Sequence, residues 1–396
     1  MPYDAAMGTN RAVIAAGVRT PFGKYRGGLS SIRPDDLLSA AYQQLLKESP
    51  QLDPVSIDDV IAGDSNGSGE DNRNVARMSL LLAGFPVTVP AVTVNRLCGS
   101  GAEAISQAAR AIRSGDADLI VAGGVESMSR APWVLPKSDE PLDHKLSLQQ
   151  TTVGWRMTNP KMPKEWTVPL GESAENIAKI FGISRAEQDE WSVRSHQLAH
   201  AAWENGFHDH VFALNGVERD ECIRPNTSLE ILGTLASAFS KGGDVTAGNS
   251  SPLNDGAVAM LITSEERAKQ LELEPISYIL SSAVSARAPQ EFTIAPVEAI
   301  YKALTRAGKT MADVDVFEIN EAFAAMVLSV FHEIPEMDRN KVNPNGGAIA
   351  MGHPIGASGA RIVIELAREL RRRGGGIGVA AACIGVGQGI AMVLEA

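Results

Sequence analysis

Short apolar runs alternate with stretches of helical apolar spacing in the first third of the chain. The run Val87–Val94 is rich in β-branched residues and predicts a buried strand. After it, apolar residues recur at helical spacing from Ala102 to Ile112, and Ser114-Gly115 ends the predicted helix. Further strands are predicted over residues 11–17, 60–63 and 118–125, and further helices over residues 35–46 and 74–83. This order is typical of a parallel α/β sheet, in which functional loops follow the carboxyl ends of the strands.

The pattern changes near Met128. Residues 129–169 lack sustained periodicity and predict an irregular region. Residues 172–203 predict a helix, for which Ser173 is a weak N-terminal cap. A glycine- and serine-rich stretch then leads to a strand predicted at 258–263. We therefore expect an N-terminal half over residues 1–127, completed by about 254–274, an inserted domain over 128–253, and a C-terminal half over 275–396.

The C-terminal half repeats the N-terminal half. Ser100-Gly101-Ala102 recurs as Ser358-Gly359-Ala360, a shift of 258 positions (358 minus 100), and the same shift matches Val121-Ala122 with Val379-Ala380. Both copies read strand, glycine turn, helix, strand. Coincidence is the alternative, since glycine turns recur for steric reasons, but we interpret the match as a duplication. Two related halves would place equivalent loops around one shared cleft.

Length, composition and charge narrow the class of protein. A chain of 396 residues exceeds the usual size of one hydrophobic core, and 44% hydrophobic with 21% charged residues is typical of a soluble globular protein. The net charge of −11 argues against a nucleic-acid or membrane-surface partner. The chain has no run of about 18 apolar residues and no basic, apolar leader, so we expect neither a membrane span nor a signal peptide.

The cysteines and histidines bear on redox and metal chemistry. The three cysteines show no CxxC spacing and cannot all pair, which favours a reduced, cytoplasmic setting. His196 and His200 lie four residues apart, but the sequence offers no nearby acidic third ligand. We interpret these histidines as parts of helix faces and expect no metal site.

Four strand-end loops carry reactive or polar groups. Cys98 lies between a strand and a helix, where the helix dipole would lower the thiol pKa from about 8.5 towards neutrality. The alternative is that Cys98 is a small buried residue. The other loops supply Asn320 after the strand predicted at 314–319, His353 at the end of a glycine-rich loop, and Cys383 with Gly385 after the strand at 377–382.

These groups suit acyl transfer through a thioester. Cys98 needs a base, and the imidazole of His353 titrates near neutral pH. Cys383 becomes useful when a second proton has to move, for instance at a carbon α to a carbonyl. The Asn320 amide and the Gly385 N–H can each donate to an oxyanion, and one such donor contributes about 3 kcal/mol to a transition state.

Six motifs extend this set of residues along the chain. They are Asn95–Gly101 (NRLCGSG), Gly123–Arg130 (GGVESMSR), Thr246–Ala257, Asn320–Ala324 (NEAFA), Asn345–Gly359 and Cys383–Gly389. In this order they resemble the thiolase family of acetyl-CoA acyltransferases over essentially the whole chain. The resemblance implies duplicated halves in α/β/α/β/α layers and ping-pong thiolysis of a 3-ketoacyl-CoA by coenzyme A, or the reverse condensation.

The resemblance assigns roles to the loop residues. It implies that Cys98 is the acylated nucleophile, that His353 activates it, and that Cys383 handles the proton on the substrate α-carbon. Asn320 with His353 would form one oxyanion hole, and the N–H groups of Cys98 and Gly385 the other.

The resemblance also implies substrate contacts and partners. Arg224 matches a position against the CoA adenine, and Ala247 and Ser251 match positions near the pantetheine. The remaining substrate-binding candidates are Leu170, Phe292 and Phe323. CoA and acetyl-CoA are expected as substrates rather than as tightly bound cofactors, in a homodimer or homotetramer of fatty acid metabolism and β-oxidation.

Departures from the family pattern leave the substrate open. Val386 replaces the central glycine of the commonest pattern, and Pro169-Leu170 replaces the His-Met of biosynthetic members. Residues 151–160 resemble the 3-oxoadipyl-CoA thiolase subgroup, which accepts a carboxylated acyl tail. Arg156 or Lys161 would bind that carboxylate, or both are solvent-exposed charges.

Two further alternatives concern the reaction itself. A decarboxylating ketoacyl synthase on the same fold would need a second His, or an Asn in place of Cys383. A non-catalytic acyl-CoA-binding relative would be expected to have lost a catalytic residue, and none is lost.

Overall fold

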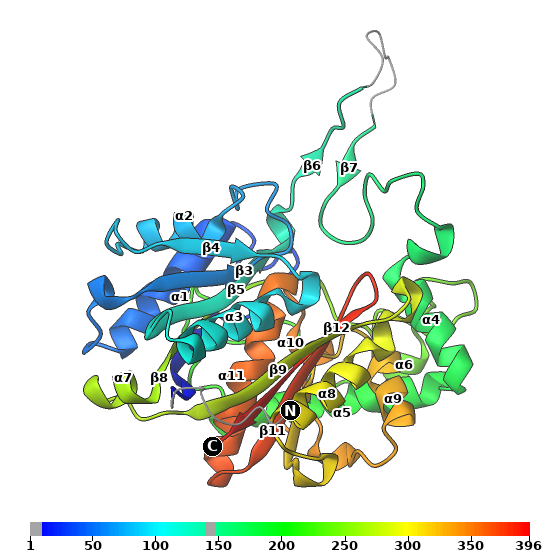
Figure 1. Ribbon diagram of the computed structural model, residues 1–396. Helices are drawn as coiled ribbons and strands as arrows, with labels where there is room; N and C mark the ends of the chain where they lie inside the picture. Colours follow the sequence, from blue (N-terminus) through cyan, green and yellow to red (C-terminus); the bar gives the residue numbers. More distant parts are fainter. Residues whose placement is uncertain (1–9, 139–146) are drawn as a thin grey trace.

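Two sets of strands, one from each half of the chain, join into one ten-stranded sheet (Figure 1). The computed structural model describes residues 10–138 and 147–396. The strands of this sheet are β1 (Ala12–Arg19), β2 (Gly23–Lys24), β3 (Asp59–Gly63), β4 (Ala91–Val94), β5 (Leu119–Ser127), β8 (Asn254–Ser264), β9 (Ser277–Ala286), β10 (Val316–Ile319), β11 (Ile377–Ile384) and β12 (Gln388–Glu395). A separate two-stranded sheet pairs β6 (Trp133–Val134) with β7 (Gln149–Gln150).

Four strands of each half of the sheet share one topology, and β4 is an additional strand at the edge of the first half. The first has the order β4-β3-β5-β8-β1 and the second β10-β11-β12-β9, and β1 pairs with β9 where they meet. In the first half β3 runs parallel to β5, and β5 runs antiparallel to β8. In the second half β10 runs parallel to β11, and β11 runs antiparallel to β12. The repeat in the sequence therefore corresponds to a repeat in strand order and direction.

Helices cover the outer faces of the two half-sheets, and two further helices lie between the half-sheets. They are α1 (Pro34–Glu48), α2 (Val75–Leu82), α3 (Ser100–Ser114), α4 (Leu170–Phe181), α5 (Arg185–Glu204), α6 (Leu229–Gly233), α7 (Glu265–Gln270), α8 (Ala295–Arg306), α9 (Ala324–Glu333), α10 (Ala348–Met351) and α11 (Ile355–Arg373). One apolar cluster joins α1 and α2 to the first half-sheet, and another joins α8 and α9 to the second. A third contains α3 and α11 with residues of both half-sheets. These clusters confirm the predicted α/β/α/β/α layering, with α3 and α11 as the middle layer.

The repeated Ser-Gly-Ala segments lie where the two central helices cross. A β-carbon at Gly101 would lie 2.6 Å from the Ala360 nitrogen, and one at Gly359 would lie 2.6 Å from the Ala102 nitrogen. Because no side chain fits at this distance, the glycines allow the two backbones to touch. The crossing brings the N-terminal ends of both helices, and the loops before them, close together.

The structure corrects two expectations. Only Ala91–Val94 of the predicted strand 87–94 is a strand, and it lies at the edge of the sheet, with Val92 41% exposed. Residues 172–203 form two helices instead of one, because Gly182 adopts a φ of 66° and ends α4. Ser184 and Glu187 then form a capping box that starts α5, whereas α4 begins after Pro169 and does not use Ser173 as its cap.

In its described residues, 129–138 and 147–169, the predicted irregular region contains only short elements beside its loops. Besides β6 and β7 it includes two turns of 3-10 helix, at Met128–Arg130 and Lys164–Trp166. Residues 139–146 of this region lie outside the described residues. Residues 1–9 do so as well, and the expectation about a signal peptide depends on them. Among the helices of the described residues, none is both long and apolar enough to cross a membrane.

Candidate active site

Cys98 lines a cavity whose walls come from both halves of the chain and from the inserted segment. It belongs to η2 (Leu97–Gly99), a short 3-10 turn between β4 and α3, and Leu97 adopts a positive φ of 46° in that turn. Both α11 and β11 pack against η2. The cavity is narrow, with a volume of about 90 Å³. Its walls are Ser65, Asn66, Leu97, Cys98, Thr151–Arg156, Leu170, Ile355 and Gly385.

The resting form of Cys98 differs from the sequence-based expectation. Burial raises the pKa of the Cys98 thiol to about 11, although N–H groups of Gly385 and of Cys98 itself act in the opposite direction. The expected fall of this pKa towards neutrality is therefore wrong, because desolvation outweighs the helix terminus and the N–H donors. A thiol of this kind needs a base that removes its proton as it attacks.

His353 is held so that one ring nitrogen can act as a base. Its Nδ1 lies 2.6 Å from the Ser358 hydroxyl oxygen, and that hydroxyl donates to the Pro354 carbonyl at 2.8 Å. Since the hydroxyl proton is used by Pro354, Nδ1 carries the imidazole proton and Nε2 keeps its lone pair. The Asn320 amide nitrogen lies 3.5 Å from Nε2.

The protonation state of His353 supports the same assignment. Burial, together with the charge of Arg361, lowers the pKa of His353 to about 3, so the expectation that this imidazole titrates near neutral pH is wrong. The imidazole is therefore neutral at physiological pH and can accept a proton. A hydrogen bond from the His353 N–H to the Asn254 side chain, 3.1 Å long, fixes the backbone of this loop.

Cys383 lies at the end of β11, which packs against the Cys98 turn, and Gly385 follows that strand. Burial and the neighbouring Cys98 thiol raise the pKa of Cys383 well above its usual value. Gly385 lines the cavity, and its N–H hydrogen-bonds the Cys98 sulfur. Val386 adopts a φ of 68°, a conformation that is costly for a β-branched residue and normally taken by glycine.

The predicted substrate contacts fall into two groups. Leu170 and Arg156 line the cavity with Cys98, and Arg156 donates a hydrogen bond of 3.3 Å to the Asn66 amide oxygen. Lys161 is exposed and does not belong to the walls of this cavity. Phe292 is 2% exposed and belongs to the apolar cluster beside α9, where its ring meets Phe323 edge-on.

Three further candidates lie on and beside the inserted segment. Arg224 and Ala247 are exposed, whereas Ser251 is half-buried. The Ser251 N–H donates to the Ala322 carbonyl at 3.0 Å, which joins the loop of residues 246–251 to the Asn320 motif.

Sequence reasoning missed the residues that hold the reactive groups. Glu321 is fully buried, and its carboxylate accepts hydrogen bonds from Trp191, Ser195, Asn343 and Ile349. The repeat includes Ser358 and the motif Gly123–Arg130 includes Glu126, but the sequence assigns neither residue a role. An acidic residue inside an apolar strand was the available signal for Glu126.

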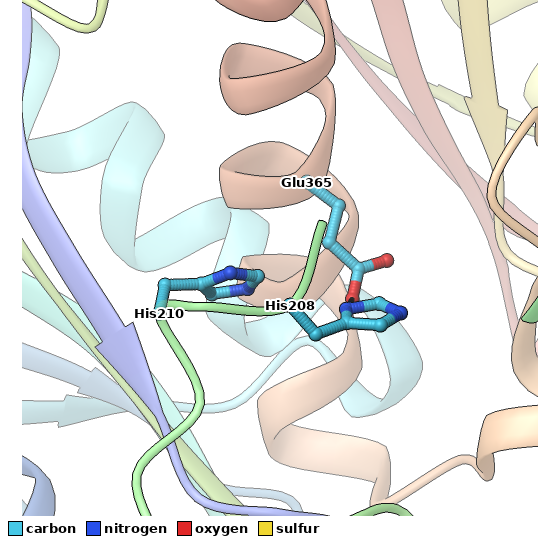
Figure 2. A group of neighbouring side chains, drawn as sticks. All are labelled: His208, His210 and Glu365. Atoms are coloured by element: carbon cyan, nitrogen blue, oxygen red, sulfur yellow. Dashed lines mark ion pairs between the residues drawn. The ribbon is translucent and has the colours of Figure 1, made fainter. Parts of the chain in front are cut away.

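A second cluster combines residue types that bind metals. Figure 2 shows His208 and His210 beside Glu365 of α11. However, the Arg19 Nη2 atom lies 3.4 Å from His208 Nδ1 and 3.3 Å from Glu365 Oε1, and Arg361 binds the other oxygen of Glu365 at 2.6 Å. Two guanidinium groups already neutralise this carboxylate and would repel a cation. We therefore interpret the cluster as a buried ionic network.

Comparison with known proteins assigns the chain to a family. Residues 12–266 match the family described as thiolase, N-terminal domain, and residues 273–396 match thiolase, C-terminal domain. A 3-oxoadipyl-CoA/3-oxo-5,6-dehydrosuberyl-CoA thiolase of Escherichia coli K12 is 47% identical over 97% of this chain and 99% of its own. A beta-ketoadipyl-CoA thiolase of Acinetobacter baylyi is 46% identical over 97% and 99% of the two chains.

Solved structures give the same assignment. Human mitochondrial 3-ketoacyl-CoA thiolase, determined in complex with CoA, superposes with a TM-score of 0.91 at 37% identity, over 98% of each chain. The acetyl-CoA acetyltransferase of Bacillus anthracis superposes with a TM-score of 0.90 at 38% identity, over 98% of this chain and all of the other. The chain therefore belongs to the thiolase family and is an acyltransferase that acts on CoA thioesters.

Proposed function

We propose that the protein cleaves 3-oxoacyl-CoA with coenzyme A through an acyl thioester on Cys98. One observation carries the proposal: the Cys98 thiol and the Gly385 N–H meet in one cavity, and a neutral His353 with a free Nε2 lies in the loop before α11, which packs against the Cys98 turn. Nucleophile, oxyanion donor and base are thus combined at one site.

In the first half-reaction, the Cys98 sulfur attacks the 3-oxo carbonyl carbon while His353 Nε2 takes the thiol proton. The N–H groups of Cys98 and Gly385 are positioned to stabilise the oxyanion. The C2–C3 bond then breaks, its electron pair stays on C2, and Cys383 protonates C2 to release acetyl-CoA. Asn320 and His353 stabilise the enolate oxygen of this leaving group.

In the second half-reaction, CoA attacks the acyl group on Cys98. The Cys383 thiolate accepts the proton of the CoA thiol, and the His353 imidazolium returns its proton to the departing Cys98 sulfur. Both side chains regain their starting states, so the cycle balances without any further reactant. CoA and its esters act as substrates, with no tightly bound cofactor.

A second, narrower function is favoured by Arg156. Its guanidinium lies in the wall of the Cys98 cavity, and the one hydrogen bond described for it is to the Asn66 amide. An acyl chain ending in a carboxylate would bring that group to a guanidinium, as expected for a 3-oxoadipyl-type substrate. The names of the relatives in E. coli and A. baylyi agree with such a substrate, which would place the enzyme in aromatic catabolism rather than β-oxidation.

Assembly and organisation complete the proposal. Val87 is 75% exposed and Val92 is 41% exposed beside the free edge of β4, and pairing of this edge in a homodimer would cover them. Trp133 and Leu148, 67% and 61% exposed on the arm of β6 and β7, would join two dimers into a tetramer.

We further assign residues 1–127 and 275–396 to the two halves of the enzyme. Residues 128–253 form an inserted CoA-binding domain, which contains Arg224, Ala247 and Ser251. We assign the enzyme to the cytoplasm.

Steady-state kinetics test the reaction. Thiolysis of acetoacetyl-CoA should give parallel double-reciprocal lines against CoA concentration, as expected for a ping-pong mechanism. Cys98→Ala should lose at least about 10³-fold in kcat, whereas Cys222→Ala, which removes a thiol outside the cavity, should keep the parent rate. Activity retained in Cys98→Ala would refute the mechanism. CoA binding without turnover on any 3-oxoacyl-CoA would instead support a non-catalytic relative.

Substrate competition tests the role of Arg156. The ratio of kcat/KM for 3-oxoadipyl-CoA over acetoacetyl-CoA should fall about 10- to 100-fold in Arg156→Gln. Lys161→Gln is the matched control, since it removes a nearby charge that does not line the cavity. An unchanged ratio in Arg156→Gln would refute recognition of the carboxylate.

A further inference from the structure

Glu126 lies buried at the carboxyl end of β5, behind the cavity that contains Cys98. Its Oε2 atom accepts a hydrogen bond from the Ser65 N–H at 3.1 Å and another from the Gly356 N–H at 2.9 Å. Ser65 follows β3, and Gly356 is in the first turn of α11. One carboxylate therefore joins three elements from both halves of the chain.

The two donors belong to different parts of the chain that both reach the wall of the cavity. Ser65 lines it directly, and Ile355, next to Gly356, lines it as well. His353 precedes Ile355 by two residues, so the position of the first turn of α11 also sets the position of the base. A shift of either donor would change the distance between the nucleophile and the imidazole.

The first turn of α11 packs directly on the ends of β3 and β5, and the Glu126 carboxylate hydrogen-bonds the backbones on both sides of this contact. A β-carbon at Gly356 would lie 2.2 Å from the Val125 carbonyl oxygen and 2.9 Å from the Asp64 α-carbon. The first turn of α11 therefore lies directly on the ends of β3 and β5, with no side chain between them. A carboxylate that accepts N–H groups at a helix N-terminus is stabilised by the helix dipole.

The charged surroundings of Glu126 are acidic. Asp64 at the end of β3 and Asp71 in the following loop face it, and the Cys98 thiol is within its electrostatic reach. Burial and the charge of Asp71 raise the pKa of Glu126 to about 7, and its negative charge in turn raises the pKa of Cys98. The charge on Glu126 therefore opposes ionisation of the nucleophile.

We propose that Glu126 is a positioning residue that clamps the Ser65 and Gly356 backbones together at the wall of the Cys98 cavity. The inference rests on the proposed function, since it assigns Glu126 a part in the reaction of Cys98 and His353. Glu126 does not itself touch the substrate.

Two substitutions separate the clamp from the charge. Glu126→Ala removes the oxygen that accepts both hydrogen bonds and should lower kcat for acetoacetyl-CoA thiolysis about 100-fold, because a displacement of about 1 Å at a reacting group costs that much. Glu126→Gln keeps one carbonyl acceptor and should recover most of this loss, to within about tenfold of the parent. The KM for CoA should stay within about threefold in both variants, since neither removes a substrate contact.

The matched control lies at the other end of the same strand. The Asp58 carboxylate accepts the N–H groups of Asp118 and Leu119 at 2.8 and 3.0 Å, at the start of β5. Asp58→Asn makes the same chemical change as Glu126→Gln, but far from the cavity. It should leave kcat at the parent value.

Alkylation of Cys98 supplies a readout that is independent of turnover. The rate of carboxymethylation of Cys98 by iodoacetamide, followed from pH 7 to 10 by peptide mass spectrometry, reports ionisation of the thiol. Glu126→Gln should shift this profile to lower pH, with alkylation at pH 8.5 at least about threefold faster than in the parent.

The outcomes are distinct. Parent values of kcat in Glu126→Ala would overturn the clamp. If Glu126→Ala does not fold, Glu126→Gln decides the question, and an unchanged alkylation profile together with an unchanged kcat would overturn the inference. Failure of the proposed function would be recognised separately, because the parent enzyme itself would then show no thiolysis while the alkylation profiles could still be compared.

Discussion

Removal of the Ser358 hydroxyl tests how His353 is held as a base. Ser358 accepts the Nδ1 proton of His353 at 2.6 Å and donates to the Pro354 carbonyl at 2.8 Å. Ser358→Ala leaves a buried N–H without an acceptor, which costs about 1–3 kcal/mol. In the transition state His353 becomes an imidazolium, and a hydrogen bond from a charged donor is about twice as strong as a neutral one.

The difference between the two states sets the expected loss of rate. If the bond contributes about 1 kcal/mol more in the transition state, kcat falls roughly fivefold to tenfold, because about 1.4 kcal/mol corresponds to a factor of ten. KM for CoA should not change, since Ser358 does not line the cavity. Steady-state thiolysis of acetoacetyl-CoA measures both quantities.

A buried serine in another helix provides the control for Ser358. The Ser329 hydroxyl in α9 donates to the Met326 carbonyl at 2.7 Å and is fully buried. Ser329→Ala should lose a similar amount of stability and keep the parent kcat. A kcat for Ser358→Ala within twofold of the Ser329→Ala value would refute the assignment of His353 Nδ1 as the protonated nitrogen.

Two predictions concern stability. Glu321→Ala leaves four buried donors unsatisfied and should lower the free energy of unfolding in urea by more than about 3 kcal/mol; a loss below about 1 kcal/mol would contradict this. His210 is buried, and burial lowers its pKa well below 6.5, so the unfolded chain binds its proton first as pH falls. Stability should therefore decrease below about pH 6.5, by up to about 1.4 kcal/mol per pH unit for this residue. His210→Gln should lose about 1 kcal/mol less than the parent between pH 7.5 and 5.5, and an identical loss in both proteins would exclude His210 as a source.

The architecture and the reactive residues were predictable because they depend on local patterns. Apolar runs and helical spacing gave the order of strands and helices around Cys98, and the repeated Ser-Gly-Ala segments gave the two halves. Since the functional loops of parallel strands meet at one edge, the sequence predicts one cleft for Cys98 and Gly385, and both line the same cavity.

Properties that depend on long-range packing were not predictable. The β-branched run before Cys98 gave no indication that β4 has only one neighbour and is half exposed. The pKa of Cys98 was expected to fall, because the helix after it is visible in the sequence and the depth of its burial is not. The partners of Glu126 and Glu321 lie tens to hundreds of residues away along the chain, beyond the reach of any spacing rule.

The acyl thioester on Cys98 is the central claim, and mass spectrometry tests it most directly. The enzyme is incubated with acetyl-CoA, quenched in acid and digested, and the peptide containing Cys98 is compared with those containing Cys222 and Cys383. We predict a stoichiometric acetyl group on Cys98 that disappears when CoA is added before the quench. An acetyl group found on another residue, or none on Cys98 in an enzyme that still turns over, would contradict the account.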